Sequence, residues 1–231
     1  MIISHEKKFI FIKARKTAGT SLEIALSKFC GAKDVITIIP IKDEKVREKL
    51  GYRRSQNFLK NYIEYSPREW KQFLVEGEKP KKFVNHMAAY KVRELLKPQI
   101  WNSYFKFCFE RNPWDKVVSF YFWRNPSEPR PSLSEFIQND GASFLQKKGS
   151  FGLYGANGQV IVDQVFLYEN LEQELEVLSH KLGLGEAIVL PRTKADVRKE
   201  QRSYRELISD SDREIIANIF AQEINLFGYE F

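Results

Sequence analysis

The chain has 231 residues, of which 43% are hydrophobic and 14% aromatic, so it can fill a substantial core and global disorder is excluded. No segment approaches the roughly 20 apolar residues that span a bilayer, and no signal peptide is visible, so a soluble, cytoplasmic protein is expected. The net charge of +7 favours anionic partners, but no RNP, helix-turn-helix or zinc-finger pattern supports nucleic-acid binding.

Short apolar runs alternate with helical patterns along the chain, which is typical of an α/β fold. Strands are expected at 8–14, 35–41, 81–86, 103–110 and 162–169, and helices at 20–29, 66–74, 87–96, 113–123, 132–138, 170–185 and 211–227. Residues 42–64 are charged and tyrosine-rich and give no clear pattern. The pattern predicts a three-layer sandwich with a mostly parallel central sheet, as a single domain over residues 1–231.

The first predicted strand leads directly into a turn, FIKARKTAGTSLE, that suits a bound phosphate. Lys16 adds a mobile cation, Gly19 lets the backbone approach a ligand, and Thr20 with Glu23 fits a capping box at the following helix. A P-loop-like phosphate-binding turn is therefore expected, and the alternative is an ordinary capped helix with a surface lysine. The nucleoside-triphosphate pattern G-x-x-x-x-G-K-[ST] is absent, because no glycine precedes Lys16 in the turn.

The strongest strand signal, residues 103–110, places Arg111 at its carboxyl end, where ligands bind in open α/β sheets. Ser119 follows in the next helix, so the guanidinium of Arg111 and this hydroxyl are positioned to hold one anion from two sides. Alternatively, Arg111 pairs with Glu110 or Asp115, and Ser119 is merely a small helix residue.

These two segments together resemble the donor-binding segments of sulfotransferases, most like the carbohydrate (Golgi-type, family 2) branch. KARKTAGTSLE is similar to the segment that binds the 5′-phosphosulfate, and RNPWDKVVSFY to the one that binds the 3′-phosphate. The resemblance covers most of the chain, and residues 42–80 match least. It implies a soluble enzyme that moves a sulfuryl group from 3′-phosphoadenosine 5′-phosphosulfate (PAPS) to a hydroxyl acceptor, expected to be a glycan or glycolipid. The product is 3′-phosphoadenosine 5′-phosphate (PAP), and no metal is required.

The resemblance also assigns donor-binding residues. They are Lys13, Arg15, Lys16, Thr17, Ala18, Gly19, Thr20, Ser21, Arg111 and Ser119. Two of them depart from the family: Arg15 stands where proline is usual, and Lys13 is charged where strand residues are often apolar. Both are expected to add phosphate contacts. In the basic loop 190–207, Arg192, Lys194 and Arg198 are further candidate ligands, with a solvated loop as the alternative.

The segment FVNHMAAY is similar to the family segment in which a histidine faces the acceptor hydroxyl, so His86 is the expected general base. An ordinary histidine pKa lies near neutrality, which suits this role. By the same resemblance, Lys16 is expected to neutralise charge on the leaving oxygen. The alternative for His86 is a structural histidine at a strand end. Glu110 is a rival base, but its place beside Arg111 suggests an ion pair.

The remaining expectations concern other side chains and other functions. Cys30 and Cys108 lie far apart and the three histidines are scattered, so neither a disulfide framework nor a metal site is expected. Tyr52, Tyr121 and Trp123 are candidates to stack on adenine or a sugar, with core packing favoured for the last two. A kinase-like phosphotransferase with a divergent phosphate-binding loop is the alternative function, and a non-catalytic nucleotide- or nucleic-acid-binding module is a further one.

Overall fold

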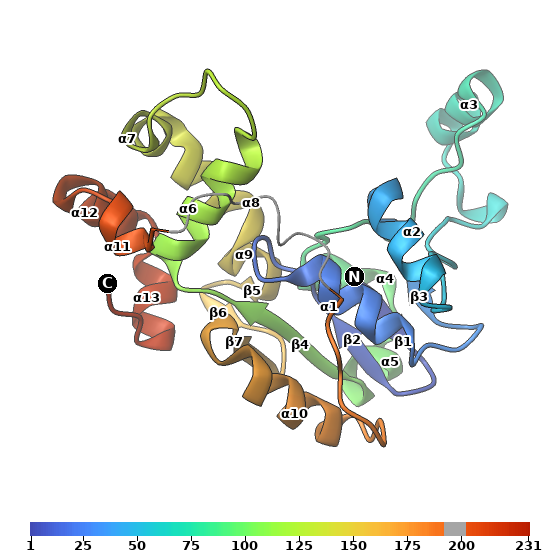
Figure 1. The fold of residues 1–231 in the computed structure, drawn as a ribbon. Coiled ribbons are helices and arrows are strands. Elements are labelled where there is room, and N and C mark those ends of the chain that lie inside the picture. Colours follow the sequence, from blue (N-terminus) through green and yellow to red (C-terminus); the bar gives the residue numbers. More distant parts are fainter. Residues whose placement is uncertain (192–201) are drawn as a thin grey trace.

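A five-stranded sheet lies at the centre of the computed structural model, which describes residues 1–191 and 202–231 (Figure 1). The strand order is β3-β1-β2-β4-β7, where the strands are β3 (Val35–Ile36), β1 (Ile2–Ser4), β2 (Phe9–Phe11), β4 (Phe105–Glu110) and β7 (Gln164–Leu167). β2, β4 and β7 run parallel to one another, whereas β1 is antiparallel to both of its neighbours. The sheet is therefore mostly parallel, as expected, with an antiparallel edge.

The described helices are α1 (Gly19–Ser27), α2 (Ile41–Lys49), α3 (Pro67–Glu76), α4 (Ala89–Leu95), α5 (Pro98–Ser103), α6 (Pro113–Arg124), α7 (Leu133–Phe136), α8 (Ala142–Gly149), α9 (Phe151–Tyr154), α10 (Leu171–Lys181), α11 (Tyr204–Leu207), α12 (Asp210–Ile219) and α13 (Ala221–Phe227). Two short strands, β5 (Gly155–Ala156) and β6 (Gln159–Val160), form a separate hairpin. The predicted helix 211–227 is divided at Phe220, whose side chain is fully buried where the chain bends between α12 and α13.

Alternating side chains of the central strands fill two separate cores, one on each face of the sheet. Phe9, Phe11 and Phe107 point to the face that α1 and α10 cover, and Ile10 and Cys108 point to the face that α4, α5 and α9 cover. This alternation follows from the two-residue period of a strand. Helices thus cover both faces of the sheet, which is the expected three-layer arrangement (Figure 1).

A third core lies beyond the carboxyl end of β4, within the helical part of the fold. The buried side chains of α6, among them Val117, Val118 and Phe120, pack there against α7, α8 and α12. Asn112 caps α6 by accepting hydrogen bonds from the backbone N–H groups of Trp114 and Asp115. The cap and Pro113 begin the helix directly after the strand, so the face of α6 is fixed relative to the strand end.

The strands differ from the sequence expectations in two places. β1 was missed, because its three residues, Ile2–Ser4, are too few to show a period; its pairing with β2, Ile2 opposite Phe11, forms it. Residues 81–86 form no strand: Lys81 makes an isolated bridge with Leu59, and the rest is a loop that ends at His86. Phe83 explains the apolar signal, since it anchors this loop in the core beneath α4.

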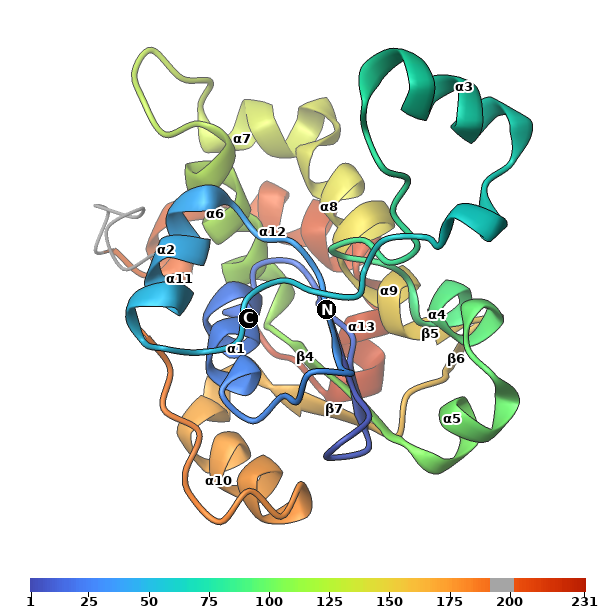
Figure 2. The ribbon, with the colours of Figure 1, turned by 90° about the vertical axis from the view of Figure 1, so that its right-hand side faces the viewer.

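The segment that matched the family least, residues 42–80, contains α2 and α3. Ser66 caps α3 and Pro67 is its first residue, as the sequence predicts. In both views α3 extends away from the rest of the fold (Figures 1 and 2). The chain then returns from this projection to the sheet and reaches His86, so the projection lies next to the candidate site in sequence.

Candidate functional site

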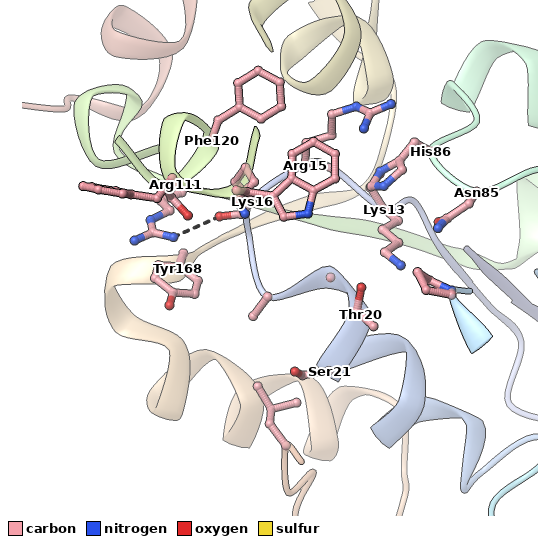
Figure 3. A pocket seen from close by; sticks show the side chains of 18 of the residues that line it. Lys13, Arg15, Lys16, Thr20, Ser21, Asn85, His86, Arg111, Phe120 and Tyr168 are labelled. Atoms are coloured by element: carbon pink, nitrogen blue, oxygen red, sulfur yellow. Dashed lines mark hydrogen bonds between the residues drawn. The ribbon is translucent and has the colours of Figure 1, made fainter. Parts of the chain in front are cut away.

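A pocket of about 610 Å³ opens at the carboxyl ends of β2, β4 and β7, where the sequence analysis placed the ligand. Its lining comprises Lys13, Ala14, Arg15, Lys16, Ala18, Gly19, Thr20, Ser21, Pro40, Asn85, His86, Arg111, Ser119, Phe120, Phe122, Trp123, Tyr168, Leu190 and Pro191. Arg111 and Tyr168 lie on one side of Lys16, and Asn85 and His86 lie on the other (Figure 3). The pocket thus brings most of the predicted site residues together.

The turn between β2 and α1 has an unusual backbone. Lys16 and Ala18 adopt left-handed conformations, with φ of 63° and 53°, and α1 begins at Gly19. A Cβ at Gly19 would lie 2.8 Å from Cγ of Lys13 and 3.3 Å from the carbonyl oxygen of Ala14, so the glycine is needed for close packing. Ala18 occupies the cap position, so the expected capping box of Thr20 and Glu23 is wrong.

Glu23 is instead the centre of a buried ion-pair cluster below the pocket. Its carboxylate lies 2.8 Å from Nζ of Lys13 and 3.0 Å from the ammonium of Met1, and it accepts a hydrogen bond from Thr37. Burial raises the pKa of Glu23, but Lys13 and the Met1 ammonium outweigh it and lower the pKa to about 2. Lys13 therefore lines the pocket with a charge that Glu23 already neutralises, and the phosphate contact expected for it stays a prediction.

The other two basic residues of the turn lie along the pocket wall. Nε of Arg15 donates to the carbonyl oxygen of Lys148 at 2.9 Å, which ties the turn to the end of α8. Nζ of Lys16 lies 5.6 Å from the centre of the Trp123 ring. The side chain of Lys16 thus extends from the turn toward α6.

Arg111 joins the two predicted donor-binding segments to each other. Its Nη1 donates to the carbonyl oxygen of Lys16 at 3.1 Å (Figure 3). Nε and Nη2 donate to Asp115. The guanidinium also lies 4.3 Å from the centre of the Tyr168 ring. Of its five N–H donors, these bonds among the described residues use three and leave two for a ligand. Ser119 lines the same pocket from α6.

His86 has a backbone φ of 56° and presents a defined tautomer. Its Nδ1 lies 2.9 Å from the carbonyl oxygen of Lys13. Because a carbonyl oxygen only accepts, Nδ1 carries the proton and Nε2 of the neutral ring has a lone pair. Burial lowers the pKa of His86 to about 3, with Lys13 and Arg15 adding to the effect, so this pKa lies well below the near-neutral value that suits a general base.

Glu110, the rival base, does not line the pocket. It is fully buried, pairs with Nζ of Lys116 at 2.5 Å, and accepts hydrogen bonds from the hydroxyls of Ser150 and Tyr154. The expected ion pair is therefore present, but with Lys116 in place of Arg111. Arg111 pairs with the second candidate, Asp115.

The structure agrees with some of the remaining side-chain predictions and differs from others. Thr17 is buried outside the pocket lining, and its hydroxyl faces the carbonyl oxygen of Ala14 at 3.5 Å, so its side chain does not point to the ligand as expected. Tyr121 is a core residue as expected, but Trp123 is 43% exposed and lines the pocket. Arg192, Lys194 and Arg198 lie outside the described residues.

Sequence reasoning missed several lining residues, namely Ala14, Pro40, Asn85, Phe120, Phe122, Tyr168, Leu190 and Pro191. A signal existed for Tyr168, because it lies at the carboxyl end of the predicted strand 162–169, the end that faces the site. Leu190 and Pro191 begin the basic loop 190–207 that was expected to supply ligands, but only its charged residues were considered. For Pro40 there was no signal, since a loop brings it to the pocket.

The part of the chain that the structure describes contains no group of three or more His, Cys, Asp or Glu arranged to hold a metal ion. Within the same residues, every helix is too short or too polar to cross a membrane. Cys30 and Cys108 are buried and not joined in a disulfide.

The profile of the sulfotransferase family matches residues 1–230. The chain is also 36% identical over 108 residues to an uncharacterized protein of Archaeoglobus fulgidus. The matched segment covers 44% of this chain and 87% of that protein. Because the family profile spans nearly the whole chain, the chain belongs to the sulfotransferase family, and its chemistry is the transfer of a sulfuryl group.

Proposed function

We propose that this chain transfers the sulfuryl group of PAPS to a carbohydrate hydroxyl. The observation that carries the proposal is that one pocket joins three parts: the turn 15–21, the pair Arg111 and Ser119, and His86. These parts are distant in sequence and differ in chemistry, as anion-binding turn, second anion site and proton acceptor. Sulfuryl transfer from a doubly phosphorylated nucleotide needs all three.

The residues present fit this donor. The N-terminal turn of α1 lines the pocket together with Lys16, and a helix N-terminus carries about half a positive charge, which favours the anionic 5′ end. We assign the 3′-phosphate to Arg111 and Ser119, and this phosphate distinguishes PAPS from ATP. When bound, the donor supplies an activated sulfuryl group. The turn is in this sense P-loop-like, without the glycine pattern of nucleoside-triphosphate enzymes.

At the acceptor end, His86 Nε2 takes the proton of the attacking hydroxyl. The bond from Nδ1 to the carbonyl oxygen of Lys13 fixes the tautomer that this role requires. A bound anion raises the pKa of a neighbouring imidazole, so donor binding moves His86 from about 3 toward a range useful for a base. Lys16 offsets the negative charge that grows on the leaving phosphate oxygen.

The family match favours sulfuryl transfer over the kinase-like alternative. The carbohydrate acceptor is supported by the resemblance of the donor segments to the carbohydrate branch and by the exposed Trp123 ring at the pocket. We expect the reaction to need no metal.

Calorimetry with PAP and 5′-AMP, both in EDTA, tests the donor assignment. Each charge-assisted hydrogen bond to the 3′-phosphate contributes about 1.5–3 kcal/mol, so PAP should bind at least about tenfold more tightly. Arg111→Ala should remove most of this preference. Arg68→Ala, on the exposed α3, is the matched control and should keep it. Equal affinity of the wild-type chain for the two nucleotides would contradict the proposal.

A further inference from the structure

A second hollow of about 340 Å³ lies beside the first pocket and shares Phe120 with it. It is formed by α6, by the kinked segment between α7 and α8, and by α8 itself. Its other lining residues are Arg124, Pro131, Glu135, Phe136, Asn139, Asp140, Gly141 and Phe144. The donor and proton-acceptor roles described above use none of these eight residues.

Three aromatic rings connect the two hollows. The Phe120 ring lies 5.7 Å from Trp123 and 6.1 Å from Phe144, with interplanar angles of 20° and 7°. We call these three rings the aromatic ledge. Trp123 and Phe144 are 43% and 41% exposed, while Phe120 between them is buried. Nζ of Lys16 lies 5.6 Å from the centre of the Trp123 ring. The ledge therefore runs from the part of the first pocket next to Lys16 into the second hollow.

The far end of the ledge carries polar groups. The guanidinium of Arg124 lies 5.3 Å from the centre of the Phe144 ring. Asn139 and Asp140 line the hollow, and within residues 1–191 and 202–231 their side chains make no hydrogen bond or ion pair. Asp140 has a φ of 65°, and a Cβ on the next residue, Gly141, would lie 2.4 Å from the carbonyl oxygen of Phe136. The kink thus holds exposed donors and acceptors beside flat apolar rings.

Flat rings edged by amide, carboxylate and guanidinium groups match the chemistry of a sugar ring. A pyranose has an apolar C–H face that lies on an aromatic ring, and hydroxyls at its edge that need hydrogen-bond partners. A purely apolar ligand would leave the polar edge of the hollow desolvated and unpaired. The combination therefore selects a saccharide over a lipid chain.

We propose that the second hollow is an acceptor subsite, and this proposal rests on the proposed function. The subsite binds the second ring of a glycoside through Phe144, Arg124 and Asp140. The first ring then lies over Trp123 with its hydroxyl toward His86. Binding of a remote ring holds the reacting hydroxyl in place, so the chain acts on oligosaccharides in preference to monosaccharides.

The test compares two-ring with one-ring acceptors. The probes are the methyl β-glycosides of cellobiose, N,N′-diacetylchitobiose and lactose and the methyl α-glycoside of maltose, each against its one-ring counterpart. For at least one pair, the wild-type enzyme should show a KM at least tenfold lower for the two-ring acceptor. Phe144→Leu keeps apolar volume but removes the flat face, and Asp140→Asn keeps a residue that tolerates the left-handed backbone. Both should move this KM ratio toward one, whereas Tyr90→Ala, an equally exposed aromatic outside both hollows, should not.

Saturation-transfer NMR of the same disaccharides gives a readout that does not depend on turnover. Binding that is lost in Phe144→Leu supports the subsite. If no disaccharide of the set binds, or if Phe144→Leu weakens one-ring and two-ring acceptors equally, the subsite is wrong. The proposed function is judged separately, because PAP affinity depends on Arg111 and Ser119 and not on the ledge.

Discussion

Lys16 and His86 share an unusual property at the scale of single residues: both have a left-handed backbone, with φ of 63° and 56°, and both line the pocket. Such conformations cost free energy in residues other than glycine and gather at functional sites. The bond from His86 Nδ1 to the Lys13 carbonyl oxygen and that from Arg111 to the Lys16 carbonyl oxygen hold the two backbones in place. Asparagine tolerates this conformation, so it is the matched replacement at both positions.

The two asparagine variants should fail in different ways. Lys16→Asn removes a cation assigned to the donor in both its bound and reacting states, so it should lower kcat and weaken PAP binding. His86→Asn removes only the proton acceptor, so PAP affinity should remain while turnover falls by about 10²–10⁴. Steady-state kinetics with calorimetry separates the two effects. Wild-type turnover in His86→Asn would show that His86 is structural.

The low pKa of His86 predicts a specific pH dependence of the folding stability when no donor is added. The unfolded chain binds a proton at this residue near pH 6.5 and the folded chain near 3, so stability should fall as the pH drops from about 6.5 toward 3. His86→Asn should flatten this part of the urea-unfolding profile. In ring NMR spectra, the signals that disappear in His86→Asn should not shift between pH 8 and 5. A titration centred near 6.5 would contradict the lowered pKa of His86.

Which side chains reach the site could be predicted only in part from the sequence. Arg111 and Ser119 follow from the strand end and the helix that Pro113 begins, and the structure brings both to the pocket. For Trp123, core packing was favoured over stacking on a ligand, but its place on α6 leaves it 43% exposed at the pocket. Tyr168 was not predicted as a site residue. The fold places its ring 4.3 Å from the Arg111 guanidinium, and it supports Arg111 through this contact.

At the scale of elements, the β2–α1 connection depends on the buried ion-pair cluster of Glu23 beneath it. The strand FIFI and the following turn were predicted from local pattern, but the role of Glu23 was not, because its partners Lys13, Met1 and Thr37 meet only in three dimensions. The capping box was wrongly expected and β1 was missed because both depend on contacts between residues distant in sequence. β1 places the Met1 nitrogen against Glu23, and the Glu23 carboxylate therefore turns inward instead of capping the helix.

Removing the charge of Glu23 should therefore destabilise the connection strongly. Glu23→Gln leaves the buried ammonium of Lys13 without its counter-ion, and breaking such a buried pair costs about 3–5 kcal/mol. Urea unfolding measures the loss. Glu186→Gln, which breaks the exposed pair with Lys28, is the matched control and should have no measurable effect. Similar stability of the two variants would show that the buried cluster contributes little.

At the scale of the whole molecule, the pocket lies where the sheet and the helical core meet. The first two cores flank the strands, and the third fills the space among α6, α7, α8 and α12. Arg111 spans this boundary, since it contacts the turn after β2, Asp115 on α6 and Tyr168 after β7. The alternation of strands and helices predicted the layers, but the α3 projection and the second hollow depend on loops that carry no periodic signal.

Because the proposed donor site is assembled from three separate segments, PAP should stabilise all of them together. At one hundred times its Kd, a ligand that binds only the folded chain adds about 2.7 kcal/mol, which corresponds to roughly 5–11 °C in Tm for a chain of this size. Hydrogen exchange should slow in residues 14–21, 111–123 and around Tyr168, and it should be unchanged in α3, which lies outside the pocket. In Arg111→Ala the three segments should lose this shared protection. Protection confined to residues 14–21 in the wild-type chain would mean that the turn binds an anion alone, without the 3′-phosphate site that the proposed donor requires.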